Sequence, residues 1–257
     1  MLIRILRSIS VAFSMYSRIP MPHFEWGSRD MEYHLCFFPW VGAAIGLVEY
    51  LWLMTCNTCG LDRIPQVLVA MAIPLLITGG FHVDGYMDTA DAMSSWRTRP
   101  ERLDILKDPH IGAFAVIRLA ELGLLYAAAL FLLGGNAILL WTGTFFLSRC
   151  LSGIAVVTLA PARQEGLLAT EAKTAAPRIV RMALIIQALA VTAGMFALAP
   201  RPAAALLLAS LASLAAYRTF AYRYFGGVTG DLAGWYLCVT ELAMTITLAV
   251  TTLLGLN

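Results

Sequence analysis

Three aspartates are spaced so that a single helix face would carry all of them. Asp84, Asp88 and Asp91 lie at positions i, i+4 and i+7, which places them on one side of a helix within about two turns. No lysine or arginine occurs between Arg63 and Arg97 to neutralise them. Because like charges at this spacing repel each other, the pattern favours a bound cation. Oxygen ligands without a nearby cysteine are typical of Mg²⁺ or Mn²⁺ rather than zinc.

The acidic segment continues beyond these three residues. Residues 82–110 hold six of the 16 acidic residues of the chain. Their second block places Asp104 and Asp108 four residues apart, with Lys107 beside them. Carboxylates that hold a metal, together with cations that neutralise phosphate oxygens, are typical of phosphoryl-transfer sites. For the second block one alternative stays open, a solvated loop whose acids and bases pair with one another.

A hydroxyl nucleophile at such a site needs a base within hydrogen-bond reach. We expect this base to be His82, two residues before the aspartate face, or Asp104, one turn before Asp108. Lys107 and Asp108 complete the catalytic set that the sequence predicts.

A second block that can approach a ligand is Gly226-Gly-Val-Thr-Gly-Asp231. Glycine lets the backbone approach a ligand closely, and Asp231 stands where a helix is expected to begin. Gly227 and Asp231 are therefore expected to contact the substrate or a metal. Asp231 as a plain helix cap is the alternative.

The composition predicts the elements that must position these residues. Hydrophobic residues make up 60% of the 257, charged residues 13%, and the mean hydropathy is +0.75, whereas soluble domains carry about a quarter charged residues. This indicates an all-α, polytopic membrane bundle that occupies residues 1–257 as one domain. A net charge of +2 resembles no nucleic-acid-binding footprint.

Apolar stretches long enough to cross about 30 Å of hydrocarbon predict about seven spans, with six to eight allowed. They are residues 35–56, 64–81, 111–134, 137–160, 182–199, 203–222 and 235–255. Before them, residues 1–20 gather leucine and aromatic side chains on one side and arginine on the other. This pattern is typical of an amphipathic helix that lies on the membrane surface.

The basic residues predict the orientation. Of 18 lysines and arginines, 14 fall on the side of the N-terminus, two (Arg63 and Arg201) on the opposite side, and two within spans. Because cytoplasmic loops are rich in Lys and Arg, we expect the N-terminus and the acidic segment to lie in the cytoplasm. The expected location is a bacterial inner membrane, with the active site facing the cytoplasm.

Charged residues inside spans are costly and usually functional. Arg149 and Glu241 have no partner nearby in sequence, so they either bind substrate or pair with each other across helices. With Arg18 and Lys107, Arg149 is expected to neutralise substrate phosphates. The Gly42–Gly46 pair has the spacing that lets two helices approach closely.

Five blocks carry a resemblance to a known family. Gly79-Gly-Phe-His-Val-Asp-Gly-Tyr-Met-Asp-Thr-Ala-Asp91 resembles the G-G-x-H-x-D-G-x-x-D-T-A-D signature of cobalamin synthase, the adenosylcobinamide-GDP ribazoletransferase family. The other four blocks follow in the family's order: Ser17-Arg-Ile-Pro20, Phe38-Pro-Trp-Val-Gly42, Ile105-Leu-Lys-Asp-Pro-His-Ile-Gly112 and Gly226 to Asp231. Two positions depart from the pattern, Ala92 and Ala115, where glycine is expected. They weaken inferences about backbone approach and leave the carboxylates unaffected.

The resemblance implies the last step of nucleotide-loop assembly in vitamin B12 biosynthesis. Members join adenosylcobinamide-GDP to α-ribazole or its 5′-phosphate, release GMP and use Mg²⁺. It implies these two substrates and membrane lipid as partners, and leaves open a homo-oligomer or other corrinoid-assembly enzymes.

Two other classes remain as alternatives. A CDP-alcohol phosphotransferase would carry A-R after a D-G pair, which is absent after Asp84-Gly85. A cation transporter would use the aspartates as an ion path, but such sites usually lie near mid-membrane, and these aspartates are expected at a loop edge.

Overall fold

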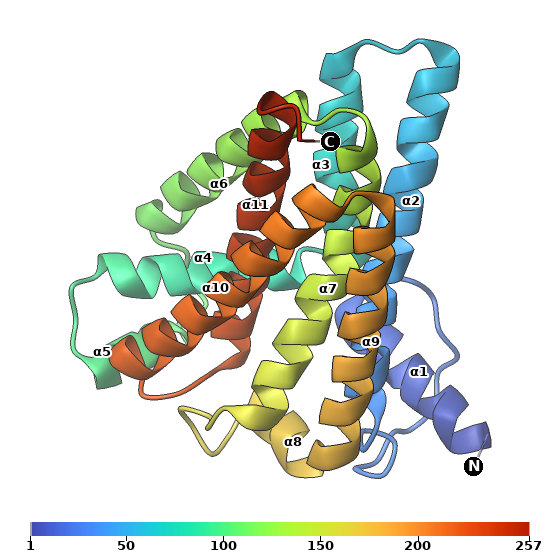
Figure 1. Cartoon of the computed structure of the whole chain (residues 1–257). Coiled ribbons are helices and arrows are strands. Elements are labelled where there is room, and N and C mark those ends of the chain that lie inside the picture. Colours follow the sequence, from blue (N-terminus) through green and yellow to red (C-terminus); the bar gives the residue numbers. More distant parts are fainter. Residues whose placement is uncertain (1, 257) are drawn as a thin grey trace.

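The computed structural model describes residues 2–256 and is helical over most of that range. Six helices are long and apolar enough to cross a membrane on their own. They are α2 (Phe38–Cys59, preceded by the short 3₁₀ helix η1, His34–Phe37), α6 (Ala113–Leu132), α7 (Asn136–Thr158), α9 (Pro177–Leu198), α10 (Pro200–Tyr224) and α11 (Gly230–Leu253). Figure 1 shows them as one bundle. The predicted all-helical membrane fold is confirmed.

The remaining predicted span is shorter than expected. Helix α3 (Arg63–Thr78) has 16 residues, or about 24 Å at 1.5 Å per residue. Helix α3 is long enough to count as a candidate span only when it is taken together with α4 (Phe81–Ser94). The axis of α4 is turned from that of α3 by 96°. The bundle therefore holds up to seven spans, as predicted. The acidic residues lie on a helix that leaves the direction of the bundle.

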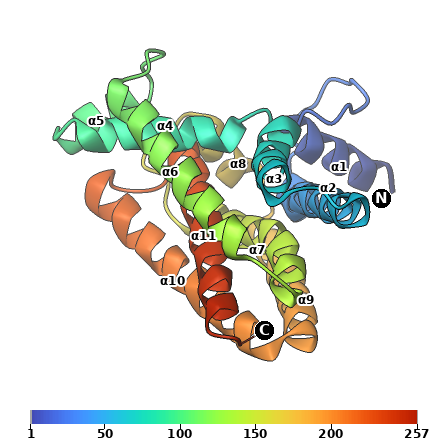
Figure 2. The same ribbon diagram turned by 90° about the horizontal axis from the view of Figure 1, so that it is seen from above.

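The centre of the bundle is α7, in whose most apolar 18-residue stretch 72% of the residues are buried within the protein. Figure 2 shows α7 and α11 side by side, with α10 on one side and α2 on the other. The outer helices α6, α9 and α10 expose leucines on their outer surfaces. Examples are Leu124, Leu189 and Leu208, each 65–72% exposed. An apolar outer surface of this extent suits contact with lipid.

Helix α2 meets α7 through the glycine pair that the sequence singled out. A Cβ atom added at Gly42 would collide with the carbonyl oxygen of Phe145, and one at Gly46 with that of Thr142. The interpretation of Gly42 and Gly46 as a close-packing motif is thus confirmed.

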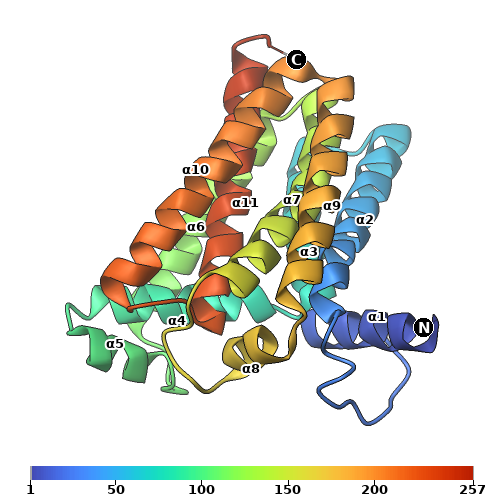
Figure 3. The same ribbon diagram turned by 60° about the horizontal axis from the view of Figure 1, so that its bottom comes forward.

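The polar elements gather at one end of the bundle. Figure 3 shows α1 (Leu2–Tyr16), α4, α5 (Arg99–Ile105) and α8 (Leu167–Thr174) at this end, with the C-terminus at the other. The hydroxyl of Tyr16 donates to the buried carboxylate of Glu171 in α8, and His34 lies 3.3 Å from the same oxygen. This end is therefore fixed by buried polar contacts, and we call it the acidic end.

Helix α1 lies across the acidic end (Figure 3), and its contact with a membrane surface stays a prediction. Arg7 pairs with Asp30 at 2.7 Å and Arg4 with Glu32 at 2.6 Å, so its basic face is held by the loop that follows. Ile3 is 73% exposed and Leu6 54%. These apolar side chains are free to enter a membrane surface.

Candidate functional site

Two glycines create the turn that brings the aspartates across the end of the bundle. Gly79 and Gly80 have φ values of +67° and +80°, a region that glycine enters without steric cost. Arg18 lies against this turn, because its backbone N–H donates to the Ile77 carbonyl at 2.7 Å. A Cβ at Gly79 would lie 2.5 Å from Arg18 Nε. The blocks containing Arg18 and Gly79 therefore form one structural unit.

The aspartate face exists as predicted. Asp84, Asp88 and Asp91 lie on α4, with Asp84 exposed and the other two half-buried. None of the three forms an ion pair within residues 2–256. Asp91 accepts a hydrogen bond from the backbone N–H of Gly112 at 3.1 Å, and a Cβ at Gly112 would displace the Asp91 carboxylate from this position.

A fourth carboxylate joins this face from α11. Partial burial is the largest of the causes that raise the pKa of the Asp88 carboxyl to about 6. The charges of three neighbours act in the same direction, those of Asp84, Asp231 and Asp91. The four aspartates therefore form one electrostatic cluster. A cation bound among them would stabilise their charged forms.

Close packing of two glycines explains why α4 and α11 meet at this point. A Cβ at Gly85 would lie 2.7 Å from the carbonyl oxygen of Asp231, and one at Gly234 2.7 Å from that of His82. Thr229 caps α11 by accepting the N–H of Leu232 at 3.2 Å. Two sequence blocks that are far apart along the chain thus share one site.

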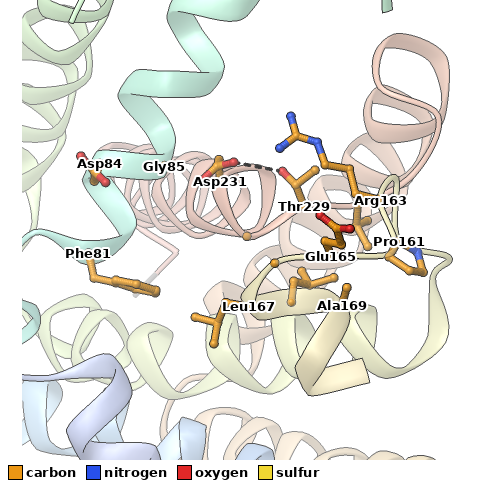
Figure 4. A pocket seen from close by; sticks show the side chains of 14 residues that line it. Phe81, Asp84, Gly85, Pro161, Arg163, Glu165, Leu167, Ala169, Thr229 and Asp231 are labelled. Atoms are coloured by element: carbon orange, nitrogen blue, oxygen red, sulfur yellow. Dashed lines mark hydrogen bonds between the residues drawn. The ribbon is translucent and has the colours of Figure 1, made fainter. Parts of the chain in front are cut away.

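A cleft of about 240 Å³ opens beside this contact. It is lined by Asp84 and Gly85 of α4, by the start of α11 through Asp231, and by a third segment that contains Arg163. In the view of Figure 4, Asp231 lies between Asp84 and Arg163, and Thr229 donates to Asp231 at 3.5 Å. Glu165 is the other charged side chain of the lining and is exposed.

Gly227 lies where two loops pair beside the cleft, and its contact with substrate stays a prediction. Val228 donates to Ala160 at 3.0 Å and accepts from Ala162 at 2.8 Å. A Cβ at Gly227 would lie 2.6 Å from the Ala160 carbonyl oxygen. The glycine therefore allows residues 160–162 to pair with residues 226–228. It shapes the wall of the cleft, whereas Val228, Thr229 and Gly230 line it.

His82 is not part of the cleft. Two residues along a helix correspond to a turn of about 200°, so His82 lies on the face opposite Asp84. Its ring is buried against the rings of Tyr16, Phe38 and Phe81, with centroids 6.3, 5.7 and 5.3 Å away. Burial, and then the charge of Arg149, hold the pKa of His82 well below its usual value. The expectation that His82 serves as the base is not supported by this position.

Arg149 also lies away from the cleft. Its side chain is buried in the bundle, where Nη1 contacts Glu241 Oε1 at 2.8 Å and the Phe145 carbonyl at 2.9 Å. Ser148 donates to the same carboxylate oxygen at 2.8 Å. Of the two readings of Arg149, the structure bears out the pair between helices. The expectation that Arg149 binds substrate has no support from this position.

The second acidic block lies on and after α5. Asp104, Lys107 and Asp108 are exposed. Asp108 accepts from the backbone and the ring of His110, at 3.0 and 2.6 Å. Arg99 holds α5 to the end of α10 through two carbonyls, each at 3.1 Å. None of the three predicted residues lines the cleft, and their catalytic roles stay predictions.

The residues suit a divalent cation in donor chemistry. Asp84, Asp88, Asp91 and Asp231 supply only oxygen, the ligand that Mg²⁺ prefers. Within residues 2–256, no three His, Cys, Asp or Glu side chains stand close enough to hold an ion as they are now placed. Asp91 is turned toward Gly112. Coordination of Mg²⁺ by the three predicted ligands stays a prediction.

Arg163 is the residue that the sequence reasoning missed. It was counted only in the charge balance, although its setting, Ala160-Pro-Ala-Arg163 directly after a span, marks a rigid turn beside a cation. Its position depends on the pairing with residues 226–228, which no local pattern reveals. The sequence signal that could have identified Arg163 is a basic residue two positions after a proline, directly after a span.

The contact at Gly85 gives a test of the shared site. Gly85→Ala should push α4 away from Asp231 and lower kcat about 10–100-fold, since a shift of about 1 Å in a reacting group has effects of this size. Gly123→Ala is the matched control, because the nearest atom to its new Cβ would be Met71 Cε at 3.8 Å. Equal activity of both variants in a turnover assay would show that the approach of α4 to α11 is not needed for catalysis.

The chain is similar to known proteins over most of its length. The sequence profile described as cobalamin-5-phosphate synthase matches residues 8–249. A protein of Lachnoclostridium phytofermentans is 41% identical over 92% of this chain and 91% of its own length. One of Sinorhizobium sp is 34% identical, over 95% and 96%, and one of Clostridium perfringens 28%, over 91% and 94%. All three are named adenosylcobinamide-GDP ribazoletransferase. No solved structure matches the chain.

Proposed function

Because this chain belongs to the cobalamin-5-phosphate synthase family, we propose that it is the membrane transferase that joins adenosylcobinamide-GDP to α-ribazole or its 5′-phosphate. The products are adenosylcobalamin, or its 5′-phosphate, and GMP. The observation that carries the proposal in the structure is the cleft at which Asp84 and Asp231 meet, on blocks from two separate parts of the chain. The resemblance of five sequence blocks agrees with this assignment.

The reaction requires the neutralisation of charge more than covalent help from the protein. A ribose hydroxyl oxygen of the acceptor bonds to the phosphorus that carries the corrinoid aminopropanol group. The bond from that phosphorus to the bridging oxygen breaks, and GMP leaves with the electron pair. Charge builds up on the phosphate oxygens during such a transfer. A site that binds a diphosphate needs fixed positive charge and a backbone that can approach the phosphates closely. The cleft has Arg163 and Gly85 in its lining.

The three aspartates of α4 would hold Mg²⁺, which supplies charge neutralisation to the phosphate oxygens when bound. The hydroxyl proton needs an acceptor. His82 is enclosed by aromatic rings, so the remaining candidates are Asp104, exposed on α5, and Asp231, half-buried in the cleft. Asp231 is the better placed of the two, because it lines the cleft.

A direct assay tests the function. Purified protein in lipid nanodiscs is supplied with adenosylcobinamide-GDP, α-ribazole and Mg²⁺, and GMP and corrinoid products are quantified. We expect GMP and adenosylcobalamin in equal amounts, and only when the acceptor is present. GMP release without acceptor, or conversion of a CDP-alcohol instead, would contradict the assignment. Uptake of cations by proteoliposomes in the absence of turnover would favour the transporter.

The charge asymmetry supports an inner-membrane protein whose acidic end faces the cytoplasm. Cysteine labelling in intact cells checks this orientation. In a Cys59→Ser background, Arg97→Cys at the acidic end should be protected from an impermeant maleimide, and Asn136→Cys at the opposite end should react. Both positions are exposed in the structure. In the protein without substitutions, the native Cys59, also exposed at the opposite end, should react and serves as a separate control. Protection of Asn136→Cys and labelling of Arg97→Cys would reverse the topology.

A further inference from the structure

Arg163 is a charged side chain that makes no hydrogen bond or ion pair with the other residues that the structure describes. Its Nη2 atom is fully buried and has no hydrogen-bond partner within the described chain. No ion pair of the described residues includes it either. A buried guanidinium nitrogen without an acceptor is costly, and arginine is suited to bind phosphate with two parallel hydrogen bonds. The missing acceptor is therefore expected to be an anion that enters the cleft.

The backbone holds Arg163 in a fixed position relative to the aspartates. The preceding residues are joined to Val228 by two hydrogen bonds, from Ala162 at 2.8 Å and to Ala160 at 3.0 Å. Val228 is followed within three residues by Asp231, which feels the charge of Arg163. A movement of residues 160–162 would therefore move Val228 as well, so the guanidinium of Arg163 and the carboxylate of Asp231 keep their spacing.

A helix end adds to the positive side. Helix α8 begins after Gly166, whose φ is +99° and which offers no capping side chain. Its first-turn residues Leu167, Leu168 and Ala169 line the same cleft. The first N–H groups of a helix have no partner inside the helix and favour anions. We call Arg163 and the start of α8 the basic wall of the cleft, and Asp84 and Asp231 its carboxylate wall. Glu165 adds an exposed carboxylate to the same lining.

We propose that Arg163, assisted by the N-terminus of α8, binds the phosphate of adenosylcobinamide-GDP that leaves as GMP. This inference rests on the proposed function and names the subsite for its leaving group. At the carboxylate wall, the aspartates of α4 would hold the Mg²⁺ that neutralises charge at the phosphorus under attack. The basic wall binds the neighbouring phosphate, which gains a negative charge as its bond to that phosphorus breaks. Arg163 replaces Arg149 in the role of neutralising phosphate, because Arg149 is paired with Glu241.

The test compares Arg163→Ala and Arg163→Lys with wild type, using α-ribazole as the acceptor so that all phosphates belong to the donor. Loss of a charged hydrogen-bonding group should raise the inhibition constant of GMP and the KM for adenosylcobinamide-GDP about 10–100-fold. The KM for α-ribazole and the inhibition by guanosine, which has no phosphate, should stay unchanged. Arg163→Lys should recover part of the loss, since it keeps the charge and loses the paired geometry.

Arg178→Ala is the matched control, because Arg178 is exposed at the start of α9 at the same end and does not line the cleft. An unchanged GMP inhibition constant in both Arg163 variants would overturn the proposal. An effect seen only with α-ribazole 5′-phosphate, on the KM of that acceptor, would also overturn it and assign Arg163 to the acceptor phosphate. Wild-type turnover in the same assay tests the proposed function separately, since it does not depend on the Arg163 variants.

Discussion

Asp88→Asn is expected to lower kcat for GMP release by about 10²–10³-fold, the loss seen when one group that stabilises developing charge is removed. The substitution keeps the size of the side chain and removes one charged oxygen from the cluster of four aspartates. Asp84→Asn and Asp91→Asn should act in the same direction, and added Mg²⁺ should partly restore the rate of each variant. The measurement is steady-state turnover over a Mg²⁺ titration.

The matched control is Asp62→Asn. Asp62 is exposed and precedes α3 at the opposite end of the bundle, so its loss should leave turnover unchanged. Near-normal activity of Asp88→Asn at limiting Mg²⁺ would remove Asp88 from the predicted ligands. A loss of protein yield in place of a loss of rate would assign the aspartates to folding.

Arg149→Met should destabilise the protein strongly. It leaves the Glu241 carboxylate inside the bundle without its partner, and removal of one member of a buried pair costs about 3–5 kcal/mol. The free energy of unfolding, measured by SDS titration in mixed micelles, reports this loss. In the double variant Arg149→Met/Glu241→Gln, the carboxylate charge is also removed and most of the stability should return.

The same pair of variants separates structure from substrate binding. The double variant should bind adenosylcobinamide-GDP with a KM close to that of wild type, because neither side chain reaches the cleft. A double variant that is stable but has a KM raised more than 10-fold would return Arg149 to the substrate site, as the sequence first suggested.

The features that followed from the sequence are those set by local physics. The spans follow from the length of apolar runs, and the Gly42–Gly46 contact from spacing along one helix. The shared face of Asp84, Asp88 and Asp91 follows from the helical period. Gly79 and Gly80, which begin the signature block, adopt positive φ values that glycine enters readily.

The features that did not follow depend on contacts between distant residues. The 96° turn between α3 and α4 requires knowledge of what α4 packs against, and that is Asp231 and Gly234 of α11. The partner of Arg149 lies 92 residues away. Arg163 reaches the cleft only because residues 160–162 pair with Val228.

The position of His82 has a local cause. It lies two residues from Asp84, and that separation places the two side chains on opposite faces of a helix. The rings of Tyr16 and Phe38 that surround His82 come from distant parts of the chain and do not follow from this geometry.

Metal binding by the aspartates of α4 underlies the proposed function, and the amount of bound Mn²⁺ measures it directly. Electron paramagnetic resonance counts the Mn²⁺ bound per chain in nanodiscs, in the presence of adenosylcobinamide-GDP, for wild type, Asp84→Asn, Asp88→Asn and the control Asp62→Asn. We expect bound Mn²⁺ in wild type and in Asp62→Asn, and its loss at the same free concentration in the two α4 variants. Equal binding in all four proteins would contradict metal binding by these aspartates.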